Sequence, residues 1–230
     1  MRPDPLTGTV IPCFTYDTPD AAEQDFYELC EGPLPLVLVF LSNFGHPISR
    51  EYLMRYVRTL PALQSGRLAC VVRSQPQRIA EGLGGGTFPF PLICDAEGVL
   101  YEHFGIRSSA SRLRWTFEAQ RIFRRAQEQG YVLQKSEPQL LPLTLAVGPG
   151  GQILFAHHGQ SLTDLPEDCA ALEQVCRHLP RPAAEAPAAA EEPTAAEEPD
   201  AAAFDVPLAG EEPAAARPAP GGAPQTAQTV

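Results

Sequence analysis

The side chains most suited to chemistry in this chain lie in one short segment, Gly45-His46-Pro47-Ile48-Ser49, which follows a continuous apolar run. His46 could act as a general base, and Ser49, one helical turn later, would lie on the same face and could hydrogen-bond to it. A helix N-terminus disfavours the imidazolium ion, so we expect His46 to be neutral near pH 7. Because no carboxylate is in place to orient His46, the pair of His46 and Ser49 is only a weak indication of hydrolase activity. The simpler interpretation is a polar histidine that caps a turn.

The elements that must position this segment are a buried strand and a helix. Residues 36–41 form a short apolar run rich in Val and Leu, typical of a strand buried on both faces of an α/β sheet. After the turn at residues 43–45 a helix is expected to begin, with Pro47 in its first turn. A thiol at such a helix N-terminus would have a lowered pKa, yet no cysteine occurs in this turn.

The remaining pattern predicts an α/β fold. Further strands are expected over residues 7–16, 68–72 and 91–94, and a hairpin over 140–147 and 152–157. Further helices are expected over residues 21–30, capped by Thr18, and over 76–83, 111–130 and 161–178, the last capped by Thr163 or Asp164. This order predicts a mixed sheet of four or five strands with helices on both faces.

One sequence motif is similar to a known family. Residues 44–53 read FGHPISREYL, close to the FGCPFCREYL run of the alkyl hydroperoxide reductase / thiol-specific antioxidant group of peroxiredoxin-like, thioredoxin-fold proteins. His46 and Ser49 stand at the two cysteine positions. The segments 67–73, 88–105 and 143–159 extend the resemblance to about residues 10–180. It implies a thioredoxin-like (peroxiredoxin-like) mixed sheet flanked by helices, with Pro142 where such proteins place a cis-proline.

Other positions depart from that family. Val39 and Asn43 stand where peroxiredoxins carry a Pro and a Thr or Ser upstream of the thiol. The resemblance implies an antioxidant thiol peroxidase or oxidoreductase, but peroxide reduction needs a thiolate that becomes a sulfenate. We therefore expect a degenerate active site in a non-catalytic binding or regulatory module that needs no cofactor, with a protein partner as one possibility.

The alternative is an active thiol-dependent oxidoreductase that uses a relocated cysteine. The candidates are Cys13, Cys30, Cys70 and Cys94. Each lies in or next to an apolar element, and burial there raises a thiol pKa and blocks access. The six cysteines form no CxxC pair and no zinc-ribbon spacing, so reduced thiols in the cytoplasm are expected.

A metal site could draw on the histidines. His103, His157 and His158 join His46 as possible ligands. Adjacent histidines on a strand point to opposite faces, so His157 and His158 cannot both bind one ion. No HxH or HxxxH spacing occurs, and no metal site is expected.

Composition divides the chain into a folded part, residues 1–180, and a tail, residues 181–230. The tail is Ala, Pro and Glu with isolated apolar residues, which cannot form a core, so we expect it to be disordered. It holds nine carboxylates and two arginines, net −7 of the chain's −11, which makes a nucleic-acid partner unexpected. No apolar stretch approaches the ~20 residues that span a bilayer, and nothing at the N-terminus resembles a signal peptide.

The expected helix at residues 111–130 has a basic face. With a nearby arginine it gathers six cations: Arg107, Arg112, Arg114, Arg121, Arg124 and Arg125. The simplest interpretation is a solvated surface, and the alternative is a surface for an acidic partner or for the acidic tail.

Overall fold

The apolar run at Leu36–Phe40 forms β3, the central strand of a five-stranded sheet. The computed structural model describes residues 4–108, 116–132 and 139–179, all within the first of two units of the chain, Met1–Ala184. The strand order is β5 (Leu92–Cys94), β4 (Arg67–Val72), β3, β6 (Leu143–Val147) and β7 (Ile153–His158). β3, β4 and β5 are parallel, and β6 and β7 are antiparallel to their neighbours. The predicted mixed sheet is confirmed.

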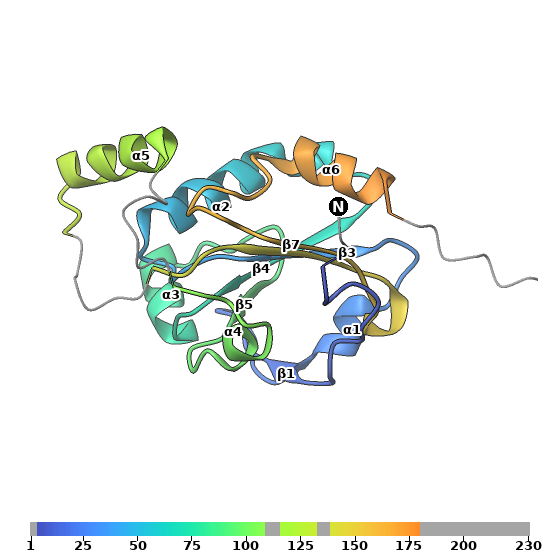
Figure 1. Ribbon diagram of the computed structural model, residues 1–230. Coiled ribbons are helices and arrows are strands. Elements are labelled where there is room, and N and C mark those ends of the chain that lie inside the picture. The colour runs from blue at the N-terminus through green and yellow to red at the C-terminus, as the bar shows by residue number, and fades with distance from the viewer. Residues whose placement is uncertain (1–3, 109–115, 133–138, 180–230) are drawn as a thin grey trace, which may run out of the picture. The chain divides into compact units, whose positions relative to one another are not determined.

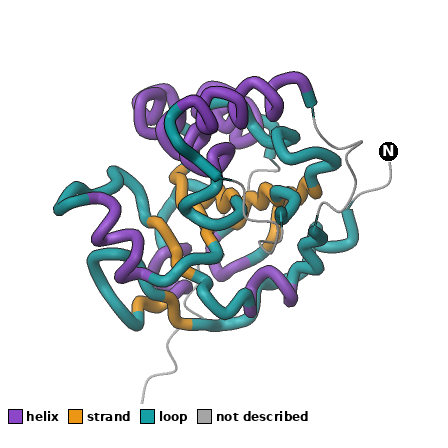
Figure 2. The backbone as a smooth tube through the Cα atoms, turned by 90° about the vertical axis from the view of Figure 1, so that its left-hand side faces the viewer, coloured by secondary structure: helices purple, strands orange, loops and turns teal. Residues whose placement is uncertain are grey.

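Side chains of β3 alternate between two apolar clusters. Val37 and Val39 face a cluster that includes residues of α2 (Pro47–Thr59), α3 (Pro76–Leu83), α5 (Phe117–Glu128) and α6 (Cys169–Arg177). Leu36, Leu38 and Phe40 face residues of α1 (Phe26–Cys30) and α4 (Val99–His103). Figure 1 shows α2 and α6 on one side of the sheet and α1 and α4 on the other. The strands lie between these helices in the side view of Figure 2. Two buried faces explain why every residue of β3 is apolar.

Hydrogen bonds from α2 hold the loop that precedes α6. The hydroxyl of Tyr52 donates to the carbonyl of Thr163 at 3.3 Å, and that of Tyr56 donates to the carbonyl of Pro166 at 2.7 Å. α5 also packs on α2, where Arg55 forms an ion pair with Glu118 at 2.8 Å. The helix that follows His46 is therefore held both by this loop and by α5.

The N-terminal part differs from the sequence prediction. Residues 7–16 do not form one strand: Val10 makes an isolated bridge with Gln152, and only Thr15–Tyr16 is strand β1, paired with β2 (Gln24–Asp25). The helix predicted from residue 21 begins at Phe26, because Asp25 caps it. Thr18 instead accepts a hydrogen bond from the N–H of Ala21 and closes a turn.

The last two helices are shorter than predicted. α6 begins at Cys169, where Asp168 accepts from the N–H of Ala171, so neither Thr163 nor Asp164 is its cap. α5 begins at Phe117, capped by Thr116. Arg112, Arg114 and the tail at residues 181–230 lie outside the described residues. Two 3-10 helices complete the described elements, Leu60–Ala62 and Pro149–Gly151. No helix in the described ranges is long and apolar enough to cross a membrane.

Candidate functional site

The turn that follows β3 brings His46 to the N-terminus of α2. The N–H of His46 donates to the carbonyl of Asn43 at 3.1 Å, and its own carbonyl accepts from the N–H of Arg50 at 3.0 Å. His46 is the N-cap residue in an extended conformation, but its imidazole makes no capping hydrogen bond. His46 therefore occupies the capping position that the simpler interpretation gives it, but it does so through its backbone and not through its side chain.

The imidazole of His46 is buried under α5. His46 is 2% exposed, and its ring packs edge-on against the ring of Phe123, with 5.2 Å between the two ring centres. Neither ring nitrogen has a hydrogen-bond partner among the described residues. Burial lowers the pKa of His46 to about 4, so the ring is neutral at pH 7. Such a ring can neither attack a peroxide nor exchange protons readily with solvent.

Ser49 lies in the first turn of α2 and is 1% exposed. It does not hydrogen-bond to His46, whose ring nitrogens have no partner in the described part of the chain. The structure therefore does not form the base–nucleophile pair that the spacing allows, and it removes both side chains from solvent.

Pro142 lies at the same end of the sheet as this turn. Leu143, the next residue, pairs with Phe40 at the end of β3. Pro142 is buried, and its carbonyl accepts from the N–H of Gly159 at 2.8 Å. Both the role of Pro142 that the resemblance implies and its cis form stay predictions.

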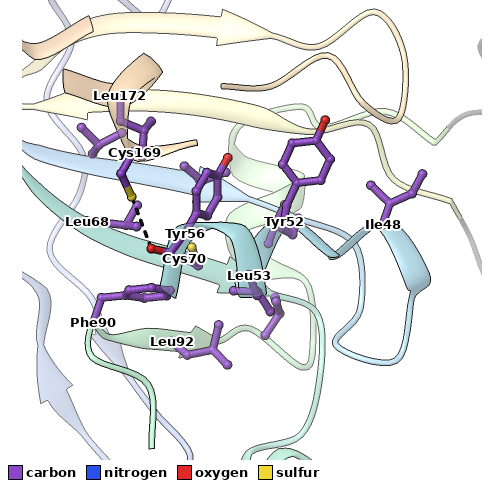
Figure 3. Packing of buried hydrophobic residues seen from close by; sticks show 14 of the residues in the cluster. Ile48, Tyr52, Leu53, Tyr56, Leu68, Cys70, Phe90, Leu92, Cys169 and Leu172 are labelled. Carbon is purple, nitrogen blue, oxygen red and sulfur yellow. Dashed lines mark hydrogen bonds between the residues drawn. The ribbon is translucent and has the colours of Figure 1, made fainter. Parts of the chain in front are cut away.

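The six cysteines are all within the described ranges and none forms a disulfide. Figure 3 shows Cys70 and Cys169 in the core between α2, α6 and the sheet, and the Cys169 thiol donates to the carbonyl of Tyr56 at 3.5 Å. Burial raises the pKa of Cys70 well above its usual range and raises that of Cys169. It raises the pKa of Cys30 and Cys176 to about 11.

Two cysteines are less enclosed. Cys94, at the end of β5, is partly buried, and burial raises its pKa to about 12, with Asp17 and Asp20 contributing. Cys13 is exposed, in the segment before β1. Of the candidates for a relocated thiol, Cys13 alone is open to solvent.

The histidines considered as metal ligands lie apart. His157 pairs with Asp164 at 3.1 Å, and His158 lies 3.7 Å from Asp4. His103 packs edge-on against Phe104. Within the described residues, no three His, Cys, Asp or Glu side chains are grouped as metal ligands would be.

Two hollows flank the turn, and neither is among the features predicted from the sequence. The first, about 600 Å³, lies between α2 and α5; its lining includes Gly45, Arg50, Met54, Arg58, Ile122 and Arg125. The second, about 500 Å³, lies between the turn and the start of α3; its lining includes Ser42, Phe44, Arg73, Ser74, Arg78 and Leu140. The spacing of Arg50, Met54 and Arg58, four residues apart, is a signal that could have identified the first hollow.

Comparisons with known proteins show the fold. No family model matches the chain, and no curated protein sequence matches it. Among solved structures, it is similar to the peroxidoxin BcpB of Mycobacterium tuberculosis, with 13% identity over 75% of this chain and 94% of that one, and a TM-score of 0.50. It is also similar to a mutant of peroxiredoxin 6 from Arenicola marina, with 16% identity over 74% and 71% and a TM-score of 0.52.

These likenesses define the class of fold as thioredoxin-like. Within that class, the chain has the peroxiredoxin-like fold that its sequence motif predicts.

Proposed function

We propose that this peroxiredoxin-like protein has a degenerate active site and acts as a non-catalytic binding or regulatory module. The observation that carries the proposal is the buried, neutral His46 at the position of the reactive thiol. Peroxide reduction begins when a thiolate attacks the O–O bond and becomes a sulfenate. An imidazole without a proton-exchange partner cannot replace that step.

The hollow between α2 and α5 is the binding surface that fits this role. Arg50 and Arg58 line it, with the half-exposed Met54 between them on α2. Arg125 of α5 forms the opposite wall, and Glu51, the one carboxylate among the described lining residues, lies 3.6 Å from it. Neither Arg50 nor Arg58 has an ion-pair partner among the residues that the structure describes.

The charge and shape of this hollow favour an acidic segment of a partner protein. Carboxylates would lie against Arg50 and Arg58, and an apolar side chain would cover Met54. Each exposed ion pair contributes only ~0–1 kcal/mol, so several pairs together with the apolar contact would be needed for specific binding. All six cysteines are free thiols, which supports a reducing compartment, and we propose the cytoplasm.

The catalytic half of the proposal is tested by peroxide consumption with thioredoxin as the reductant. The unmodified full chain is expected to consume no peroxide above the background rate. Turnover that is lost on Cys13→Ser, Cys30→Ser, Cys70→Ser or Cys94→Ser would establish the alternative, an active thiol-dependent oxidoreductase or peroxidase with a relocated cysteine.

The binding half is tested with a synthetic peptide in which one Leu is flanked by Glu residues. Binding is expected to saturate and to weaken in the variant Arg50→Gln/Arg58→Gln. Arg121→Gln/Arg124→Gln, which removes two exposed arginines of α5 outside the hollow, is the matched control and should bind as the unmodified chain does. Equal weakening in both variants would mean that the peptide senses only overall charge.

A further inference from the structure

The second hollow lies outside the carboxyl ends of the parallel strands β3 and β4. Residues 42–45 follow β3, residues 73–75 follow β4, and Arg78 comes from the first turn of α3. Crevices outside the carboxyl ends of parallel strands are where open α/β sheets bind ligands. The place therefore suits a small molecule, independently of the hollow between α2 and α5.

The lining of this hollow is positively charged. Arg73 and Arg78 contribute to it, and none of its described lining residues is a carboxylate. Arg78 is exposed and has no ion-pair partner in the described ranges. The overall charge of the chain is −11, so a cationic hollow on it is a local feature.

Arg73 is held in place without being neutralised. Its Nη2 donates to the carbonyl of Glu97 at 3.3 Å, and Gly98 lies against the guanidinium. A Cβ on Gly98 would lie 2.8 Å from Cζ of Arg73, and Gly98 has a φ of +81°, so this contact requires glycine. The side chain is fixed while its charge stays available to a ligand.

Hydrogen-bond donors complete the hollow. α3 begins at Pro76, its N-cap Gln75 makes no side-chain cap, and the first-turn N–H groups lie at the positive end of the helix dipole. Ser42 also lines the hollow, is 6% exposed, and its hydroxyl has no partner among the described residues. A buried hydroxyl without a partner costs free energy, and a ligand oxygen would supply the missing hydrogen bond.

We propose that this hollow binds a small phosphate ester, with its phosphoryl oxygens held by Arg78, Arg73, Ser42 and the N-terminus of α3. Two cations and a helix N-terminus match a dianionic oxyanion. The volume, about 500 Å³, exceeds that of a free phosphate ion and lies in the range of small-molecule sites. The partly exposed side chains of Phe44 and Ala96 offer an apolar wall for the rest of the ester.

The test is an amide NMR titration of the full chain at constant ionic strength. Phenyl phosphate is the ester, inorganic phosphate is the free anion, and sodium chloride is the charge control. Saturable shifts are expected at Asn43, Phe44, Ser74 and the first turn of α3, with phenyl phosphate binding more tightly than inorganic phosphate. Equal affinity for phenyl phosphate and inorganic phosphate would contradict an ester site and indicate a site for free phosphate.

Three variants locate the binding. Arg78→Gln should weaken phenyl phosphate about tenfold, and Ser42→Ala severalfold, because each removes a hydrogen bond to a charged oxygen. Arg50→Gln removes an equal charge from the other hollow and should leave binding unchanged. Shifts that chloride reproduces, or that persist in Arg78→Gln, would overturn the proposal and show charge screening only.

Discussion

The imidazole of His46 meets the ring of Phe123 at an interplanar angle of 86°, with 5.2 Å between the ring centres. Through this contact α5 covers the N-terminus of α2. The absence of a cysteine from this turn and its cover by α5 are thus two separate observations that support the proposal of a non-catalytic site.

Restoring the thiol alone should not restore a reactive cysteine. In His46→Cys/Ser49→Cys the new thiols occupy buried positions, so burial opposes the pKa-lowering effect of the helix N-terminus. Adding Phe123→Ala opens the position and is expected to speed alkylation of the new thiols by iodoacetamide about tenfold or more. As a control, mass spectrometry counts the native cysteines that iodoacetamide alkylates in the unmodified chain and in Phe123→Ala. Rapid alkylation before Phe123 is changed would contradict the role given to α5.

Replacing His46 with leucine should leave the free energy of unfolding unchanged or raise it by about 1 kcal/mol. The two buried ring nitrogens lack partners, and an apolar side chain of similar size removes the cost of burying them. Urea denaturation at pH 7 measures the effect, with Ser49→Ala as a neighbouring control. A loss of more than about 2 kcal/mol would indicate that the imidazole makes a stabilising contact.

The same histidine should make stability depend on pH. Its folded pKa is lowered to about 4 from 6.5, so between these values the unfolded chain binds more protons than the folded one. Stability therefore falls as pH drops from 6.5 to 4, by about 3 kcal/mol at most, and the dependence ends below pH 4. In His46→Leu the midpoint in urea should change much less across this window. If the urea midpoint of His46→Leu depended on pH as that of the unmodified chain does, other groups would titrate between pH 6.5 and 4.

Glu173 should give a second, separate pH window. Its carboxylate accepts from the N–H groups of Gln64 and Ser65 and from the Ser65 hydroxyl, and these bonds lower its pKa to about 2 from 4.5. The stabilisation is complete above pH 4.5 and is lost as pH falls through 2. Glu173→Gln should therefore be less stable than the unmodified chain at pH 7, and the difference should shrink toward pH 2. A difference that is constant with pH would contradict this assignment.

The sequence predicts the core of the fold because its signals there are periodic and local. The run at residues 36–41 is apolar throughout, and two covered faces explain it. The start of α6 could not be predicted, since an aspartate stands both at 164 and at 168. Asp164 is instead engaged by the ring of His157 and by the N–H of Gln160, and Asp168 is the cap.

The candidate site was predictable only in part. The motif places His46 and Ser49 at the start of α2, as the structure does. That Phe123, far along the chain, covers His46 is a tertiary contact with no local signal. The second hollow combines residues from four loop segments and a helix, which no spacing in the sequence links.

The packing of Gly159 against Pro142 should tolerate no side chain. A Cβ at Gly159 would lie 2.7 Å from both Cγ of Pro142 and the carbonyl oxygen of Asp164, and a backbone oxygen cannot move aside as a flexible side chain can. Gly159→Ala is expected to lower the free energy of unfolding by about 1–3 kcal/mol. Gly82→Ala is the matched control: its Cβ would meet the nearest atom, of Phe44, at an ordinary 3.6 Å. Because Gly82 lies in α3, that change should stabilise the protein by about 0.5–1 kcal/mol. Equal stability of the two variants in urea would show that the loop around Gly159 yields, and that Pro142 is not fixed by this contact.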